Sequence, residues 1–268
     1  MFNNLSLNPL NNLSTLEILS RLERYKKVDL KRITHKDLFD LTLETLPCLM
    51  VMHRNIGEGT KLYRLRGKDP GTRFSNISDV WYRKAKFVKS RQRLNDVGEA
   101  MLYTSLDQAT PFYEVKASEG QSFAHIEYEV KNGEYIQASS IGMNDNAPDF
   151  ADERGLNEQG KINQKILEQF LHTEFTKEVG IGTEYLYRIS IMLAKNFYDI
   201  PNCDGYIYPS VAFKNGLNLA VKPTAADNKL KLKKVENLIV KKIFEDGRVE
   251  FQRESVSSLI DPEGNIYY

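Results

Sequence analysis

One short span of the chain gathers side chains whose types can do chemistry. Arg91 and Arg93 lie within residues 91–98, and Tyr103 and Glu114 follow a little further along. An arginine presents a planar, permanently charged fork that can bind two oxygens of a phosphate or a carboxylate at once. A fixed carboxylate can stabilise positive charge that develops in a transition state. Two guanidiniums, a phenol and a carboxylate in one span therefore predict an active site rather than ordinary core.

Each of these residues also has a structural interpretation when it is taken alone. Glu114 and Arg93 can form only a salt bridge, and Tyr103 can be only a core residue. Ser210 follows Pro209 and can be only a turn residue. The hypothesis of an active site therefore depends on all of them occurring together.

The elements that must position these residues belong to a chain of ordinary globular composition. The 268 residues are enough to bury a sizeable core without disulfides or metals. Thirty-seven basic and 36 acidic side chains give a formal net charge of +1. No overall field therefore favours nucleic acid or an anionic membrane, and any anion site must be local.

The N-terminal part predicts helices. Residues 14–17 have the form of a capping box, and leucines at helical spacing follow them, so we expect a helix to about Tyr25. Thr34 is typical of the residue that caps a second helix, which Pro47 ends. We interpret residues 1–58 as a helical N-terminal extension.

The middle of the chain alternates between strand and helix patterns. Residues 61–66 alternate apolar and basic side chains, as a strand does. Residues 123–130 and 134–138 flank Asn132-Gly133, which is a strong signal for a two-residue hairpin. Residues 162–175 repeat apolar side chains at helical spacing, and residues 206–210 form a buried strand that ends at Ser210. These patterns predict an α+β domain at residues 59–223.

The pattern of the last segment, residues 224–268, predicts a separate small β-sheet. Residues 235–244 and 249–251 flank Asp246-Gly247 and predict a second hairpin. We therefore expect a C-terminal β appendage at residues 224–268, packed on the core.

The cysteines and the N-terminus bear on the compartment. Cys48 and Cys203 lie far apart and show no metal-type or redox-type spacing, so we expect two buried thiols in a reducing cytosol and no metal site. The first residues lack a basic start followed by a continuous apolar run, and no stretch of about 18 apolar residues occurs. These features predict a soluble, cytoplasmic protein with no membrane partner.

Residues 80–89 are basic, with aromatic side chains interleaved. In isolation this pattern can indicate a nucleic-acid surface. The rest of the chain adds no basic surplus, so we prefer a solvated loop or edge that leads into the site.

Several motifs occur together in a recognisable order. They are Tyr63-Arg64, Arg93-Leu94-Asn95 with Gly98, Leu102-Tyr103-Thr104-Ser105, Ala109-Thr110, Glu114-Val115 and the segment 204–210. This order and spacing resemble the RES-domain family, which is named after an arginine, a glutamate and a serine. The resemblance covers about Leu62 to Val221 and says nothing about either end of the chain.

The resemblance implies a fold similar to that of ADP-ribosyltransferase toxins, with a mixed sheet core and flanking helices. Many members of the family consume NAD as a substrate by breaking the nicotinamide–ribose bond, and many are toxins that a helix-turn-helix antitoxin holds inactive. Carried over position by position, it implies catalytic roles for Glu114, Arg64, Tyr103 and Ser210. It implies NAD-binding roles for Arg64, Arg93, Tyr103, Asn95 and Ser210.

The chemistry of that bond suits these residue types. Its cleavage passes through an oxocarbenium-like state, which a carboxylate such as Glu114 would stabilise while binding ribose hydroxyls. Arg64 and Arg93 would hold the pyrophosphate. The ring of Tyr103 would line the nicotinamide or ribose subsite, and Ser210 would bond the ribose or the carboxamide.

Two departures and several alternatives accompany this hypothesis. Arg91 and Gln92 stand where small residues usually precede the second arginine, and Leu94 stands where an aromatic is common. The acceptor of ADP-ribose can be water, phosphate, a protein or a small molecule, so transferase activity stays an alternative. A non-catalytic binding module on the same fold is another. An antitoxin and a homodimer are left open as partners, and nucleic acid is the weakest of the rival ligands.

Ser210 is not expected to be a nucleophile. No histidine lies beside it in the sequence, although the fold could bring His125 or His172 near. His125 falls inside a predicted strand, so a structural role is expected for it.

Overall fold

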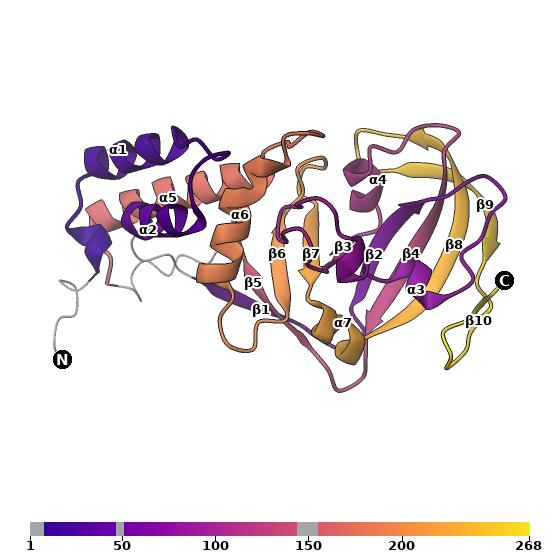
Figure 1. The fold of residues 1–268 in the computed structure, drawn as a ribbon. Helices are drawn as coiled ribbons and strands as arrows, with labels where there is room; N and C mark the ends of the chain where they lie inside the picture. The colour runs from indigo at the N-terminus through magenta and orange to yellow at the C-terminus, as the bar shows by residue number, and fades with distance from the viewer. Residues whose placement is uncertain (1–7, 47–50, 144–154) are drawn as a thin grey trace. The chain divides into compact units, whose positions relative to one another are not determined.

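The computed structural model describes residues 8–46, 51–143 and 155–268. The chain divides into two compact units, which we call the helical unit and the sheet unit (Figure 1). The helical unit contains Met1–Met52, Ser90–Asp96 and Ser140–Ile200. The sheet unit contains His53–Lys89, Val97–Ser139 and Pro201–Tyr268.

The helical unit is built from amphipathic helices with polar caps. Its elements are η2 (Pro9–Asn11), α1 (Thr15–Lys26), α2 (His35–Thr45), α5 (Glu158–Thr176), η4 (Glu184–Tyr187), α6 (Arg188–Leu193) and η5 (Ala194–Tyr198). Ser14 caps α1 by accepting a hydrogen bond from the Glu17 amide, and Thr34 caps α2 through the Asp37 amide. The two predicted N-terminal helices are therefore confirmed, and the capping residues are those that the sequence indicated. Pro47 and Cys48 lie outside the described residues.

Tyr25 joins three helices of this unit. Its ring packs edge-on against Phe170 of α5, with ring centroids 5.6 Å apart, and its hydroxyl lies 2.8 Å from the Thr42 hydroxyl on α2. Asn163 of α5 donates hydrogen bonds to the carbonyls of Leu10 and Leu13. The N-terminal helices and α5 are therefore parts of one core.

The sheet unit contains a nine-stranded sheet in the order β1-β5-β6-β7-β3-β2-β4-β8-β9. The strands are β1 (Met52–Ile56), β2 (Lys61–Gly67), β3 (Leu102–Ser105), β4 (Ser122–Val130), β5 (Ile136–Ser140), β6 (Gly205–Pro209), β7 (Leu217–Val221), β8 (Leu230–Ile243) and β9 (Val249–Val256). A second sheet pairs β10 (Leu259–Ile260) with β11 (Ile266–Tyr267). The unit's helices are α3 (Ile77–Val80), η3 (Ala85–Phe87), α4 (Thr110–Glu114) and α7 (Pro223–Lys229). The coarse expectation of an α+β protein is confirmed.

Cross-strand pairs decide which residues share a face of the large sheet. Tyr63 on β2 pairs with Ser105 on β3 and with Glu127 on β4, and paired residues point to the same side. Leu65 lies on this side too, where it packs in one cluster with Phe112 of α4. We call this side the α4 face.

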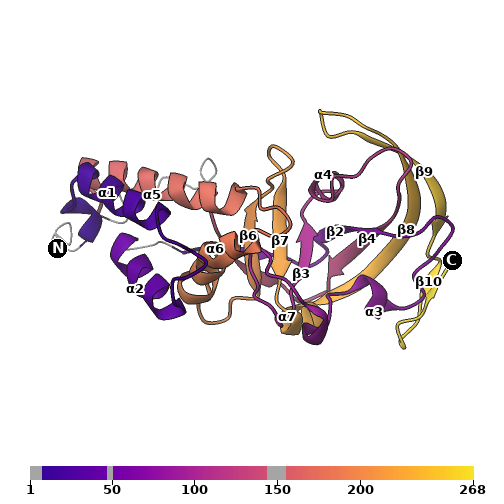
Figure 2. The same cartoon turned by 45° about the horizontal axis from the view of Figure 1, so that its top comes forward.

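The opposite side of β2 and β4 carries α3. Arg64 and Arg66 alternate with Tyr63 and Leu65 along β2, so they point away from α4. Tyr128 of β4 shares their side, where its ring packs edge-on against Trp81, next to the end of α3. In Figure 2, α3 and α4 lie on opposite sides of β2, β4 and β8. We call this side the α3 face.

The joint between β2 and β3 is narrow. These strands share one pair, Tyr63 with Ser105, whereas β2 and β4 pair along the whole of β2, from Lys61 to Gly67. The sheet therefore consists of two halves, β1-β5-β6-β7-β3 and β2-β4-β8-β9, that meet at one pair.

The predicted hairpin at Asn132-Gly133 is wrong. Both strands exist, but β4 pairs with β2 and β8, while β5 lies between β1 and β6. The turn itself is present, since Gly133 has φ of 76°. Both edges of β4 are already occupied, so the chain turns and β5 joins the other half of the sheet.

The second predicted hairpin is confirmed, but it is not an appendage. β8 and β9 pair from Ile243–Val249 onward, and β8 also pairs with β4 over the length of β4. The strands of residues 230–256 are therefore part of the main sheet, and the short helix α7 leads into them. The boundaries at 58 and 223 also differ from the observed division, because the described residues 140–143 and 155–200 fold with the N-terminal helices and β1 joins the sheet.

Within residues 8–46, 51–143 and 155–268, no helix has both the length and the apolar character that crossing a membrane requires.

Candidate active site

Glu114 is the last residue of α4, a short helix fixed at both ends. Asp107 accepts hydrogen bonds from the amides of Ala109 (2.9 Å) and Thr110 (2.8 Å), which starts the helix. Lys116, just beyond the helix, has a positive φ of 50°, which ends it. Phe112 anchors α4 in the core of the α4 face. Glu114 is held in place by this helix while its side chain is exposed.

Two buried side chains hold one oxygen of Glu114. The Ser210 hydroxyl and the Asn218 amide each donate to Oε1 at 2.6 Å. Ser210 and Asn218 are only 9% and 5% exposed. The Ser210 oxygen itself accepts from the amides of Ala212 (3.2 Å) and Phe213 (3.1 Å), so its own hydrogen is directed to Glu114.

A further buried hydroxyl orients Asn218. Ser105 donates to Asn218 Oδ1 at 2.7 Å. The two residues lie directly opposite each other on the antiparallel strands β3 and β7. The carbonyl oxygen of Asn218 is therefore used by Ser105, and its NH₂ faces Glu114. We call Glu114, Ser210, Asn218 and Ser105 the Glu114 cluster.

The other carboxylate oxygen of Glu114 is available. Among the described residues, none donates a hydrogen bond to Oε2 or forms an ion pair with Glu114. Its two donors are neutral, so they fix the carboxylate without cancelling its charge. The arrangement can present a fixed negative charge to a ligand that carries or develops positive charge.

Tyr103 lies on the same face of the sheet as this cluster. It pairs with Ala220 and stands two residues before Ser105 on β3, which places both on the α4 face. Tyr103 is half-buried. The structure thus places Glu114, Ser210 and Tyr103 on one face of the sheet unit.

Arg64 is not brought to this group. It points to the α3 face, where its Nη1 donates to the Trp81 carbonyl at 2.9 Å, at the end of α3. The neighbouring residue that does lie on the α4 face is Tyr63, whose hydroxyl accepts from Gln108 Nε2 at 3.3 Å. The interpretation of Arg64 as a partner of Glu114 in binding the substrate is therefore not supported by this geometry.

Arg93 and Asn95 belong to the helical unit. Arg93 is 8% exposed, and its guanidinium donates to the carbonyls of Glu174 (3.4 Å) and Lys177 (3.1 Å), at the end of α5. A cation is favourable there because the last carbonyls of a helix lack partners within the helix. Asn95 is buried, and its backbone carbonyl accepts from the Gln92 amide. These contacts give both residues a structural function in the helical unit.

Arg91 also has a local partner. Its Nε lies 2.9 Å from Asp96 Oδ1 in the same loop. Arg93 and Glu114, for which the sequence allowed a salt bridge, lie in different units, and each has the partners described above within its own unit.

Sequence reasoning missed Asn218 and Ser105. A signal for Asn218 was present, because it stands between apolar residues in the strand 217–221 and a polar side chain in a buried strand needs a partner. No local pattern could show that this partner is Glu114, which lies 104 residues earlier in the chain.

The histidines are structural, as expected for His125. His125 is buried and stacks on Tyr63, with ring centroids 5.6 Å apart, and burial lowers the pKa of His125 to about 4. His172 lies in the helical unit, where its Nδ1 is 2.8 Å from the Gly142 carbonyl. His125, in the same unit as Ser210, does not bond the Ser210 hydroxyl, whose bonds go to Glu114 and to two backbone amides.

The pKa of His125 predicts a pH effect on stability. Below the ordinary pKa of 6.5, the unfolded chain binds a proton at His125 that the folded chain does not bind. The free energy of unfolding therefore decreases as the pH is lowered from 6.5 to about 4. The full effect is about 3 kcal/mol. We expect the free energy of unfolding of His125→Phe, measured in urea, to decrease less between pH 6.5 and 4 than that of the wild type. The exposed His35→Gln should follow the wild type, and identical slopes in all three proteins would contradict the assignment.

Two further observations concern metal-binding groups and the described cysteine. Within the described residues, no group of three or more His, Cys, Asp and Glu side chains could hold a metal ion. Cys203 is buried, as predicted, and its Sγ lies 3.1 Å from the Gly205 carbonyl.

No family model matches the chain, and no curated protein does. The likeness to the RES-domain family therefore rests on the motif residues themselves, of which Glu114, Ser210 and Tyr103 share one face of the sheet unit.

Proposed function

We propose that this protein consumes NAD by cleaving the N-glycosidic bond between nicotinamide and ribose. The observation that carries the proposal is the Glu114 carboxylate, which has one oxygen anchored by Ser210 and Asn218 and the other available. The resemblance of the ordered motifs to the RES-domain family supports the choice of NAD among substrates that develop positive charge. The fold that this proposal implies is similar to that of ADP-ribosyltransferases.

In the proposed reaction the bond from ribose C1′ to the nicotinamide nitrogen breaks, and its electron pair stays on the nitrogen, which neutralises the pyridinium. Positive charge then lies on the ribose, where the Glu114 carboxylate stabilises it and accepts hydrogen bonds from ribose hydroxyls. An acceptor oxygen forms the new bond to C1′ and releases its proton. Water as acceptor gives ADP-ribose, and phosphate gives a phosphorylated ADP-ribose.

Ser210 and Asn218 are positioning residues in this proposal. Both donate to the anchored oxygen, so they hold the carboxylate in one orientation. The ring of Tyr103 is exposed enough on the same face to line the substrate. Arg64 receives no role, since it lies on the other face of the sheet.

The direct test is incubation of the purified protein with NAD, with and without phosphate, followed by chromatography of the products. Release of nicotinamide is expected. Labelled NAD that leaves its label on a protein or small-molecule acceptor would identify the transferase alternative. Binding of NAD without its loss would support a non-catalytic module and contradict the proposal.

Ser210→Ala is expected to reduce kcat about 10- to 100-fold, since a hydrogen bond to a charged group contributes about 1.5–3 kcal/mol. KM should change little, because the hydroxyl touches Glu114 rather than the substrate. Ser210→Thr keeps a hydroxyl and should recover part of the activity. A loss in Ser210→Ala that appears only in KM would show that Ser210 binds substrate directly.

A further inference from the structure

The α3 face carries an uncompensated cluster of arginines. Arg64 and Arg66 are neighbours on β2, Arg73 lies in the loop that follows, and Arg83 comes just after α3. We call these four residues the arginine cluster. They come from three segments of the sheet unit, namely β2, the loop that follows it and the residues just after α3.

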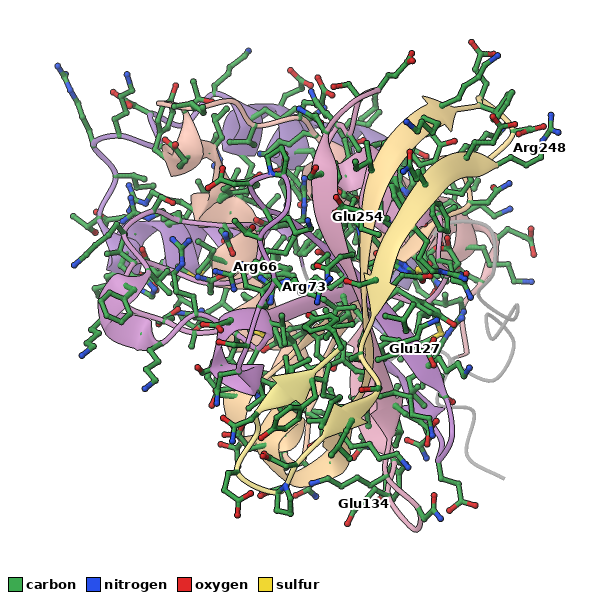
Figure 3. The ribbon with its side chains drawn as sticks, turned by 90° about the vertical axis from the view of Figure 1, so that its right-hand side faces the viewer. Arg66, Arg73, Glu127, Glu134, Arg248 and Glu254 are labelled. Atoms are coloured by element: carbon green, nitrogen blue, oxygen red, sulfur yellow. The ribbon has the colours of Figure 1, made fainter. Side chains whose placement is uncertain are left out.

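Aromatic rings position the two central guanidiniums. The Arg66 guanidinium lies over the ring of Phe74 at 5.1 Å, and that of Arg73 lies over Tyr268 at 5.2 Å. The Tyr268 hydroxyl donates to the Phe74 carbonyl at 3.1 Å, which links the two stacked pairs. Figure 3 shows Arg66 and Arg73 near each other, on the other side of β8 and β9 from Glu127.

The loop that carries Arg73 and Phe74 is fixed. The Ser75 carbonyl accepts from the amide of Ile266 on β11 at 2.8 Å, and the Ile77 amide donates to the Gly264 carbonyl at 2.7 Å. The loop is therefore held by the β10–β11 segment, so its arginine is positioned before any ligand arrives.

The charges of the cluster are not neutralised. Among the described residues, none of the four arginines forms an ion pair with a carboxylate. Partial burial and the charges of Arg64 and Arg83 lower the pKa of Arg66, which agrees with guanidiniums lying close together. The charge of Asp79 acts on Arg66 in the opposite direction, but Asp79 forms no ion pair with it, and its carboxylate accepts from the Asn76 amide in the cap of α3.

The α4 face of the same strands provides the contrast. There several cations have acidic partners: Lys61 pairs with Glu127 at 3.0 Å, Lys234 lies between Glu127 and Glu236, and Arg253 pairs with Glu236. These cations of the α4 face are therefore paired with carboxylates, whereas the four arginines of the α3 face form no ion pair with a described residue. Their free charge can be matched by an anionic ligand.

We propose that the arginine cluster on the α3 face is a binding site for the phosphate groups of a small ligand. Arginine forks bind phosphate oxygens in pairs. Each ring of the two stacked pairs has one face covered by a guanidinium, so the cluster presents charged forks rather than aromatic platforms, which single-stranded nucleic acid would use. The site is separate from the Glu114 cluster and does not depend on the proposed activity.

The test uses the full chain and calorimetric titration with inorganic phosphate and with pyrophosphate. Pyrophosphate should bind at least tenfold more tightly than phosphate, because it can engage more than one guanidinium. Arg66→Gln and Arg73→Gln should each weaken pyrophosphate binding about tenfold, whereas Arg248→Gln should leave it unchanged. Arg248 is a matched control because it is exposed on the β8–β9 turn and pairs with Asp246 at 2.8 Å (Figure 3).

Further titrations test whether a lost affinity reflects misfolding, and whether the phosphates or another part of the ligand are recognised. Arg66→Lys keeps the charge, and its affinity should lie between those of the wild type and Arg66→Gln, with unchanged thermal unfolding. A nucleotide that binds like pyrophosphate would indicate that the phosphates, not the base, are recognised. Glu114→Gln should keep full pyrophosphate affinity, so a failure of the NAD proposal would leave this site intact.

Three results would overturn the inference. The first is the absence of binding by both phosphate and pyrophosphate. The second is equal pyrophosphate affinity in the wild type and in the Arg66 and Arg73 variants. The third is a single-stranded oligonucleotide that binds far more tightly than pyrophosphate with a steep salt dependence, which would assign the face to a nucleic acid.

Discussion

Glu114→Gln is expected to lower the rate of nicotinamide release from NAD by about 10²- to 10⁴-fold. Glutamine has nearly the same shape and can still accept the hydrogen bonds of Ser210 and Asn218 at one oxygen. It lacks the negative charge that would stabilise the ribose cation. Because the charge matters most in the transition state, the loss should appear mainly in kcat.

Glu119→Gln is the matched control for this substitution. Glu119 is an exposed glutamate five residues further along the chain, and it takes no part in the Glu114 cluster. Its rate should equal that of the wild type. An unchanged rate in Glu114→Gln, with the fold intact, would remove Glu114 from the chemistry and with it the basis of the proposed function.

Gly205→Ala is expected to destabilise the protein by about 3 kcal/mol. Gly205 begins β6 and pairs with Val221 on β7. An added Cβ would lie 2.3 Å from the Ala220 carbonyl oxygen, which is a backbone atom of a paired strand and cannot move away alone. The two strands would have to separate, and β6 leads directly to Ser210. The free energy of unfolding, measured by urea denaturation, checks this expectation.

Gly57→Ala provides the comparison. An added Cβ at Gly57 would meet nothing within 4 Å, and its backbone does not need a positive φ. Its stability should differ from that of the wild type by less than about 1 kcal/mol. Equal stabilities of the two variants would show that β6 and β7 can adjust to a side chain at Gly205.

Local signals predicted the local structure well. The residues that cap α1 and α2 were identified from the sequence because a capping hydrogen bond joins residues three apart. The turns at Gly133 and Gly247 were also recognised, and both glycines have positive φ. Such features depend only on neighbours in the chain.

Strand pairing could not be predicted in the same way. The same type of turn signal joins two strands that pair with each other at Asp246-Gly247, but joins two strands that pair with other strands at Asn132-Gly133. The difference lies in which edges β2 and β8 already occupy, and a turn sequence carries no information about that. For the same reason the tail could not be recognised as part of the main sheet.

The candidate site was predicted in part. Glu114 and Ser210 are in contact, as their order in the resemblance implied, but their relation is that Ser210 holds Glu114. Arg64 was misplaced because alternation along a strand shows which residues share a side, but not which side faces α4. The guanidinium of Arg93 was interpreted as a ligand for phosphate, whereas it satisfies backbone carbonyls at the end of α5.

The single pair between β2 and β3 has a consequence for motion. A sheet joined at one pair can open there without breaking the pairs inside either half, so each half should behave as a cooperative unit with its own protection against amide exchange. Ser105 is one member of that pair and also orients Asn218. Phe112 anchors the helix of Glu114 in the core of the β2-β4-β8-β9 half, whereas the two donors to its carboxylate, Ser210 and Asn218, belong to the other half. Opening at this seam would therefore draw the carboxylate away from the side chains that hold it.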